Sequence, residues 1–171
     1  MADDELAEMA RRVIDGNRYL VLGTVGADGL PRLSPVYFTA ARYRDFYWVS
    51  SPDAQHSHNV RERPEVRIVV FDSSTQPGTS EAVYLSATAR ELAEHELPDV
   101  LDEAFDPARG GRRFGPEELT GDGDLRLYVA TATAYDVHVR GSHPTHGTGI
   151  DRRMATDPTT PSPTGRSGDG G

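Results

Sequence analysis

The sequence predicts a mainly β domain, in which the strands form a small antiparallel barrel and a few helices lie at its edges. Several short segments of the 171-residue chain are rich in valine, tyrosine, threonine and other strand-forming residues. Turns that contain glycine or proline join most of these segments as hairpins. Helical periodicity occurs in few places, whereas a doubly wound parallel sheet would alternate strands with helices. Together these observations favour the barrel.

The chain begins with a segment of helical periodicity. Its apolar residues are Leu6, Met9, Ala10, Val13 and Ile14. Spacings of three and four residues place such side chains on one face of a helix. We therefore predict an amphipathic helix over residues 3–15, which ends near Gly16 and covers one side of the sheet.

Residues 19–71 are predicted to hold four strands and a second helix. The strands are YLVLGTV at 19–25, RLSPVYF at 32–38, FYWVS at 46–50 and EVRIVVF at 65–71. A glycine-rich turn, GADGLP, joins the first two strands as a hairpin. Ser51 and Pro52 are typical of an N-cap and a first helical residue, so we expect the helix DAQHSHNVRER to begin there. Pro64 then ends it.

The second half of the chain is predicted to add two strands and a tail. A polar loop precedes a fifth strand at 82–92. Residues 91–124 are acidic and broken by proline and glycine, so we expect one short helix there, peripheral to the core. The sixth strand, at 125–139, is long enough to bend at a bulge. We therefore assign residues 1–153 to the barrel domain and 154–171, rich in proline, glycine, serine and threonine, to a disordered tail.

Composition excludes several classes of chemistry and partner. The chain has no cysteine, which removes thiolate nucleophiles, disulfides and iron–sulfur clusters. All 18 basic residues are arginine, so no lysine can form a Schiff base. A net charge of −9 argues against nonspecific nucleic-acid binding, which depends on neutralising many phosphates. Because neither a signal peptide nor a run of membrane-spanning length is visible, we expect a cytoplasmic protein without a membrane partner.

Two polar residues on the second strand are candidate ligand contacts. Arg32 and Ser34 alternate along the strand and therefore point to the same face, where both could donate hydrogen bonds to an anion. Pro35 beside them interrupts strand pairing and belongs at an edge or a bulge. The alternative interpretation is that Arg32 is simply a solvated residue next to a turn.

The junction between the third strand and the second helix is the other candidate site. Ser50 and Ser51 end the strand where unpaired backbone amides at a helix start could attract a phosphate group. His56, one turn into the helix, would add a donor. The alternative is an ordinary capped helix without a ligand.

The histidines do not predict a metal site. His56 and His58, two residues apart, project to nearly opposite sides of a helix. A looser group near the end of the sixth strand contains His138, His143 and His146, but the spacing of zinc signatures is absent. The chain also lacks the Gly-x-Ser-x-Gly elbow of many hydrolases.

Taken in order, three stretches resemble the pyridoxamine 5′-phosphate oxidase-like family of FMN-binding split barrels. They are VLGTVGADGLPRLSPVYF, FYWVSSPDAQHSHNVRERPEVRIVVFD and AVYLSATARELA, within about residues 5–140. The resemblance implies an N-terminal helix followed by a six-stranded split β-barrel. It also implies a homodimer with FMN in a groove between the subunits.

The same resemblance implies a set of cofactor-binding residues. They are Arg32, Ser34, Trp48, Ser50, Ser51, His56, Ser57 and Asn59. In the family, the residues that match Arg32, Ser50 or Ser51, and His56 contact the flavin phosphate, and Ser34 and Trp48 are expected to flank the ring. His56 stands where many relatives have lysine or arginine. Ala82 stands where the oxidase itself has a glutamine in contact with the flavin, so vitamin B6 oxidation is not supported.

The resemblance implies an FMN-binding oxidoreductase, in which hydride passes through the flavin and the protein mainly positions the cofactor. No catalytic residue is assigned. Two alternatives use the same barrel: a reductase that depends on the deazaflavin coenzyme F(420), or a non-enzymatic carrier or sensor that binds a flavin or haem. The sequence does not identify the substrate or the electron donor.

Overall fold

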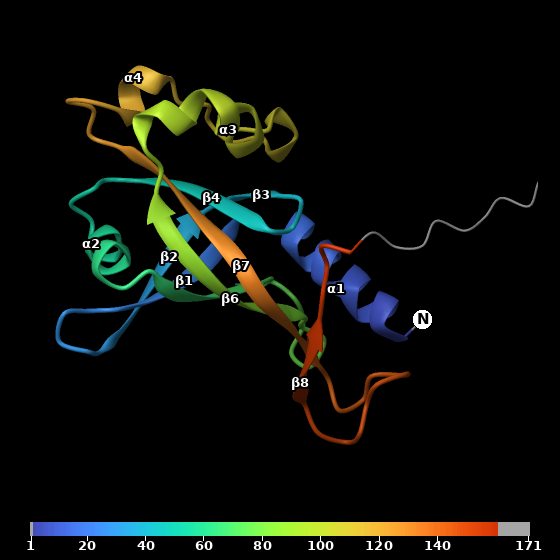
Figure 1. Ribbon diagram of the computed structural model, residues 1–171. Helices are drawn as coiled ribbons and strands as arrows, with labels where there is room; N and C mark the ends of the chain where they lie inside the picture. Colours follow the sequence, from blue (N-terminus) through green and yellow to red (C-terminus); the bar gives the residue numbers. More distant parts are fainter. Residues whose placement is uncertain (1, 161–171) are drawn as a thin grey trace, which may run out of the picture.

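One curled antiparallel sheet forms the centre of the molecule, and helices lie along its edges and over one of its faces (Figure 1). The computed structural model describes residues 2–160. The strands are β1 (Tyr19–Val25), β2 (Pro31–Tyr37), β3 (Thr39–Ala41), β4 (Asp45–Ser50), β5 (Glu65–Phe71), β6 (Ala82–Glu91), β7 (Arg126–Val139) and β8 (Arg152–Thr156). The α-helices are α1 (Ala2–Gly16), α2 (Gln55–Glu62), α3 (Leu97–Ala104) and α4 (Pro116–Leu119), with short 3₁₀ turns at Glu94–Glu96 and Pro107–Arg109.

The order of the strands confirms the predicted antiparallel barrel with flanking helices. The sheet runs β2-β1-β5-β6-β7-β4-β3, and β8 pairs with β7. Every strand pair is antiparallel. The predicted bulge in the long last strand is also present, because the β6–β7 register shifts between Ser86 and Ala87.

All six predicted strands and the N-terminal helix are present, and two further strands were not predicted. One is β3, three residues long, which pairs with β4 across the turn at Arg42–Arg44. The other is β8, whose residues pair with Tyr135 to Val139 of β7. The expectation of disorder from Met154 onward is therefore wrong for Met154–Thr156, because strand pairing orders a segment of low hydrophobicity. Residues 161–171 of the expected tail lie outside the described residues.

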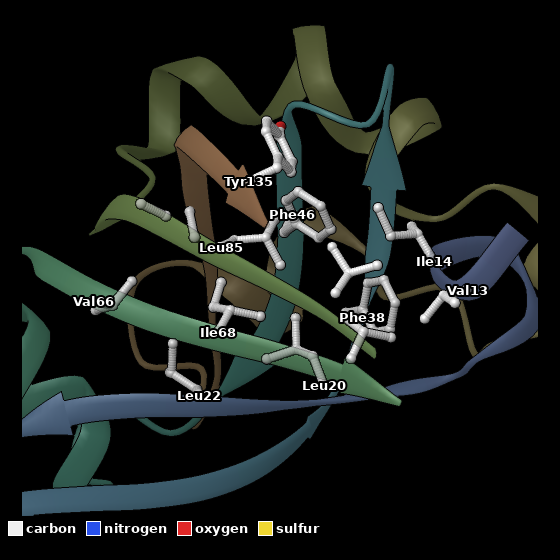
Figure 2. Close-up of a cluster of buried hydrophobic side chains, with 14 of the residues drawn as sticks. Val13, Ile14, Leu20, Leu22, Phe38, Phe46, Val66, Ile68, Leu85 and Tyr135 are labelled. Atoms are coloured by element: carbon white, nitrogen blue, oxygen red, sulfur yellow. The ribbon is translucent and has the colours of Figure 1, made fainter. Parts of the chain in front are cut away.

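The barrel core is made by the alternating apolar positions of the strands and the apolar face of α1. Leu20 and Leu22 of β1 point inward and meet Val66 and Ile68 of β5, while Phe38 packs against Phe46 with ring centroids 5.9 Å apart (Figure 2). Val13 and Ile14 of α1 close one side of this cluster.

A second apolar cluster lies on the outer side of β4 and β7. Tyr47, Leu127 and Val129 project from the strands and pack under Leu97 and Leu101 of α3. Figure 1 shows α3 and α4 together over this part of the sheet. Residues 91–124 were expected to be peripheral, and they do lie outside the barrel, but they build a cluster of their own.

Helix α2 begins later than predicted. Its first residue is Gln55 and its N-cap position is Ala54, rather than Pro52 and Ser51. The residues between form a turn, in which the Ala54 amide donates to the Ser51 carbonyl at 3.1 Å. The turn delays the helix by three residues and moves its free amides toward His56.

Among residues 2–160, no helix combines the length and apolar character needed to cross a membrane.

Candidate cofactor-binding site

Helix α2 is fixed to the sheet by hydrogen bonds from its own polar side chains. The Ser57 hydroxyl donates to the Ser51 carbonyl at 2.7 Å, and the Asn59 amide donates to the Thr24 hydroxyl at 2.9 Å. Ser57, Asn59 and Thr24 are all buried. Arg63, directly after the helix, donates to the Gly26 carbonyl at 2.7 Å. Ser57 and Asn59, both predicted cofactor contacts, therefore hold the helix in place with their polar atoms.

The structure brings Ser50 and His56 together. The Ser50 Oγ at the end of β4 lies 2.8 Å from the His56 Nε2, a hydrogen bond in which either group can donate. Burial lowers the pKa of His56 below its ordinary value. The imidazole is therefore neutral near pH 7 and offers one donor and one acceptor.

The start of α2 has no side-chain cap. Ala54 at the N-cap supplies no oxygen, and the first turn carries no acidic residue. Four amides at the beginning of an α-helix lack partners within the helix, and here the first of them, Ala54, already donates to the Ser51 carbonyl. A bound anion is one group that satisfies the other three. Because His56 belongs to this first turn, the free amides and the Ser50–His56 pair lie together at the junction of β4 and α2.

Ser51 does not cap α2, which corrects that part of the prediction, and its contact with a cofactor stays a prediction. Its hydroxyl accepts a hydrogen bond from the Asp53 amide at 3.2 Å, and its carbonyl accepts from Ala54 and from Ser57. It therefore shapes the turn before α2 rather than capping the helix.

Arg32 and Ser34 lie on the same face of β2, as predicted. They pair in register with Thr24 and Leu22 of β1, both of which point into the barrel. Since Asn59 of α2 contacts Thr24, the Arg32 end of β2 and α2 lie at the same end of the barrel. Arg32 is engaged by Asp28 of the preceding turn at 2.6 Å, and its side chain is 40% exposed. Arg32 is therefore a solvated residue next to a turn, as in the alternative interpretation, and the ion pair leaves its guanidinium accessible.

Trp48 is a core residue. Only 2% of it is exposed, and its ring stacks on Tyr128 with centroids 5.5 Å apart and an interplanar angle of 15°. Its Nε1 is buried without a hydrogen-bond partner among residues 2–160. Trp48 is also among the residues that line the cavity described next, but its ring lies on the barrel side of β4, and contact with a bound ring stays a prediction.

A mainly apolar cavity of about 280 Å³ lies between the outer side of β4 and β7 and the segment that follows α3. The sheet side is formed by Tyr37, Thr39, Tyr47, Trp48, Val49, Leu125 and Leu127, and the opposite side by Ala104, Phe105, Gly111, Arg112 and Phe114. Val49 directly precedes Ser50, so the cavity wall ends one residue from Ser50, whose side chain alternates to the opposite face of β4.

The aromatic walls of this cavity were not predicted. Phe105 and Phe114 lie with ring centroids 5.6 Å apart, in a region that the sequence indicated as peripheral. Tyr47 projects from β4 toward them, and burial, with Asp45 and Glu103 nearby, raises its pKa to about 12. The sequence predicted one short helix within residues 91–124, but not what that helix covers.

The histidines near the end of β7 separate into two groups. His138 lies 3.4 Å from Asp151, while His143 and His146 face Glu5 of α1 at 3.9 and 3.2 Å. Within residues 2–160, no three histidine or carboxylate side chains are arranged to hold a metal ion.

Comparisons with known proteins agree with the architecture. The sequence matches the family described as pyridoxamine 5′-phosphate oxidase over residues 6–138. No curated protein is a significant match.

Several solved structures share the fold at low sequence identity. A haem-binding protein from Mycobacterium smegmatis has a TM-score of 0.64 and 18% identity, over 88% of this chain and 57% of that protein. A Clostridium acetobutylicum protein related to general stress protein 26 has a TM-score of 0.63 and 10% identity, over 92% and 99% of the two chains. HutZ, the haem storage protein of Vibrio cholerae, has a TM-score of 0.59 and 19% identity, over 82% and 99%. The present chain thus spans little more than half of the mycobacterial protein.

These structural likenesses concern the fold alone, whereas the sequence match covers most of the barrel, from α1 to the end of β7. The chain belongs to the pyridoxamine 5′-phosphate oxidase family.

Proposed function

We propose that this protein is a cytoplasmic flavoprotein, which binds FMN in a groove between two copies of the chain and acts as an oxidoreductase. The observation that carries the proposal is the Ser50–His56 pair, 2.8 Å apart, at the uncapped start of α2. The pair supplies a hydroxyl and an imidazole, and the start of α2 supplies free amides beside them. Together these groups form a donor set suited to a phosphate monoester.

The charges at this point determine how the phosphate would be held. A phosphate monoester carries about −1.5 to −2 charges near neutral pH. His56 is neutral before binding, since burial lowers its pKa, so Arg32 is the candidate cation. To reach the phosphate, Arg32 must leave Asp28, and the exposed ion pair between them costs little to break.

In this proposal the flavin ring extends from the phosphate along β2 and β4 toward Tyr37 and Val49, at the mouth of the aromatic cavity. Bound FMN would supply the two-electron chemistry, and the residues of this chain would bind and orient it. At about 280 Å³ the cavity lies just below the range of roughly 300–1,000 Å³ typical of small-molecule sites. This size fits a site that a second subunit completes.

An exposed apolar face supports the proposed homodimer. Tyr19, Leu33 and Phe71 are 61%, 74% and 42% exposed on the outer side of β1, β2 and β5. Val21 lies opposite both Pro35 and Val69 in the same layer of the sheet. Contiguous exposed apolar surface of this kind marks an interaction site. Sedimentation should show a dimer, and Leu33→Asp should give monomers that retain the far-UV circular dichroism of the wild type.

The absorption spectrum of the purified protein tests the proposed cofactor. We expect FMN to bind saturably, with a shift of its visible band, and a nicotinamide donor to reduce it. A protein that leaves the FMN spectrum unchanged at all concentrations would refute the proposal.

The neutral imidazole of His56 favours a second candidate, a non-enzymatic haem carrier. An uncharged imidazole nitrogen is the form that ligates iron. Of two proteins with a similar fold, one is named as haem-binding and the other as a haem storage protein, which supports this alternative. A strong Soret band that His56→Gln abolishes, together with no response to FMN, would favour the haem carrier. Saturable binding of the deazaflavin F(420) in place of FMN would instead favour the deazaflavin-dependent reductase.

A further inference from the structure

The aromatic cavity has almost no charge in its walls. Of its lining residues only Arg112 is ionic, and the Arg112 guanidinium lies 4.4 Å from the centroid of the Phe114 ring and pairs with Glu118. No carboxylate lines the cavity. Tyr47, whose pKa is raised to about 12, stays protonated at neutral pH. The cavity therefore offers no carboxylate to a cation, and its one cation is already engaged by the Phe114 ring and by Glu118.

The walls instead offer aromatic surface. Phe105 and Phe114, at 45° to one another, form one side, and Tyr37 and Tyr47 belong to the other. The Tyr37 hydroxyl already donates to the Arg109 carbonyl at 3.2 Å. Ring faces and edges in this arrangement pack well against another planar ring.

The volume limits the size of the ligand. A cavity of about 150 Å³ lined by apolar side chains binds benzene. The present cavity, about 280 Å³, is nearly twice as large and has room for two fused rings.

We propose that the substrate of this site is an uncharged planar aromatic compound of one or two rings, which binds in the cavity with Phe105 and Phe114 as its specificity-determining wall. The substrate role rests on the proposed function, because it places the compound beside the cofactor ring. The ligand class itself follows from the cavity. A charged analogue is rejected because burial of an unpaired charge is strongly unfavourable.

The single tryptophan of the chain provides the measurement, since Trp48 belongs to the β4 wall of the cavity and its ring lies directly behind that wall, in the barrel core. The probes are 1,4-naphthoquinone, which is neutral, and 1,4-naphthoquinone-2-sulfonate, which carries a charge. The chain has no cysteine and no lysine, so the side chains that most readily add to quinones are missing. We expect saturable quenching of Trp48 fluorescence by the neutral probe and binding of the sulfonate that is weaker by about 100-fold or more.

Two variants test the cavity wall, one by removing a side chain and the other by adding one. Phe114→Ala removes one aromatic face, and Ala104→Leu fills space from α3 with a residue that favours helices. Each should weaken naphthoquinone binding by about tenfold or more, because buried aromatic contact or cavity volume is lost. Ile150→Ala, in an exposed loop away from the cavity, is the control and should bind as the wild type does.

The outcomes separate this inference from the proposed function. Equal binding of both probes, or no effect of either variant, would overturn the ligand class. Displacement of naphthoquinone by FMN would show that the cofactor ring fills the cavity, and would overturn the substrate role. If naphthoquinone binds as expected and FMN does not bind at all, the ligand class stands and the proposed flavin function fails.

Discussion

Ser50 at the end of β4 and His56 in the first turn of α2 share a hydrogen bond of 2.8 Å between Oγ and Nε2. The bond joins a strand end to a helix start that carries no side-chain cap. The bond itself is neutral, because burial lowers the pKa of the imidazole. A ligand that brings negative charge would favour the charged imidazole. Three predictions concern this site and its supports, and a fourth concerns the segment that covers the aromatic cavity.

The affinity for FMN should rise as the pH falls from about 8 to about 6. A nearby phosphate favours the charged imidazole, so binding is accompanied by proton uptake at His56, and affinity increases where protons are more available. Fluorescence titration of FMN across this range measures the slope. His56→Gln should remove most of the pH dependence, whereas His58→Gln, on the exposed side of the same helix, should retain it. Identical slopes for both variants would contradict the role of His56.

Arg32→Ala should weaken FMN binding by about 10- to 100-fold, which corresponds to the loss of about 1.5–3 kcal/mol for a hydrogen bond to a charged group. Asp28→Asn should act in the opposite direction, since it releases Arg32 from its 2.6 Å ion pair. Arg12→Ala removes a cation that pairs with Glu81 elsewhere on the molecule and serves as the control. If Arg32→Ala binds as tightly as Arg12→Ala, the phosphate site has been misplaced.

Asn59→Ala should lower the free energy of unfolding by about 1–3 kcal/mol, because the Thr24 hydroxyl loses a buried partner. The donor and acceptor lie 2.9 Å apart, and both residues are buried. Urea denaturation gives the value. A double-mutant cycle with Thr24→Val should show coupling between the two residues, while His58→Ala should change stability little. Additive effects of Asn59→Ala and Thr24→Val would mean that this bond does not hold α2.

Arg109 should control the order of the segment that covers the aromatic cavity. Its guanidinium donates to the Asp15 carbonyl at 3.1 Å and the Asn17 carbonyl at 2.7 Å, and lies 5.1 Å from the centre of the Phe38 ring. These carbonyls lie at the end of α1, where a cation is favoured.

Hydrogen exchange tests this role of Arg109. Arg109→Ala should speed exchange at residues 105–115 by about 10- to 100-fold and leave the barrel strands unchanged. Arg113→Ala is the matched control, because its partner Asp102 is 92% exposed and such a pair contributes little. Equal exchange in the two variants would show that the apolar contacts of Phe105 and Phe114 suffice.

The sequence predicted those parts of the fold that depend on local pattern. Strands such as β1 and β5 have alternating burial that follows their residue types. The start of α2 was misplaced because Ser51 and Pro52 are as typical of a turn as of a helix cap. The β8 strand could not be predicted, since its order comes from pairing with β7 rather than from its own composition.

For the candidate site, too, the sequence predicted local features but not contacts between distant segments. The location of Ser50 and His56 at one strand–helix junction followed from the order of the elements, and the shared face of Arg32 and Ser34 followed from strand alternation, but the hydrogen bond between Ser50 and His56 was not predicted. Nor was the cavity predicted, because its two walls come from β4 and from Phe105 and Phe114, which are far apart in the sequence. No local pattern reports which side chains meet across such a separation.

A side-by-side titration of the wild-type protein with FMN and with riboflavin, which lacks the phosphate, tests for a phosphate site directly. FMN should bind at least about tenfold more tightly, because each charge-assisted hydrogen bond to phosphate contributes about 1.5–3 kcal/mol. Equal affinity for the two flavins, or binding of neither, would contradict a phosphate site at the junction of β4 and α2.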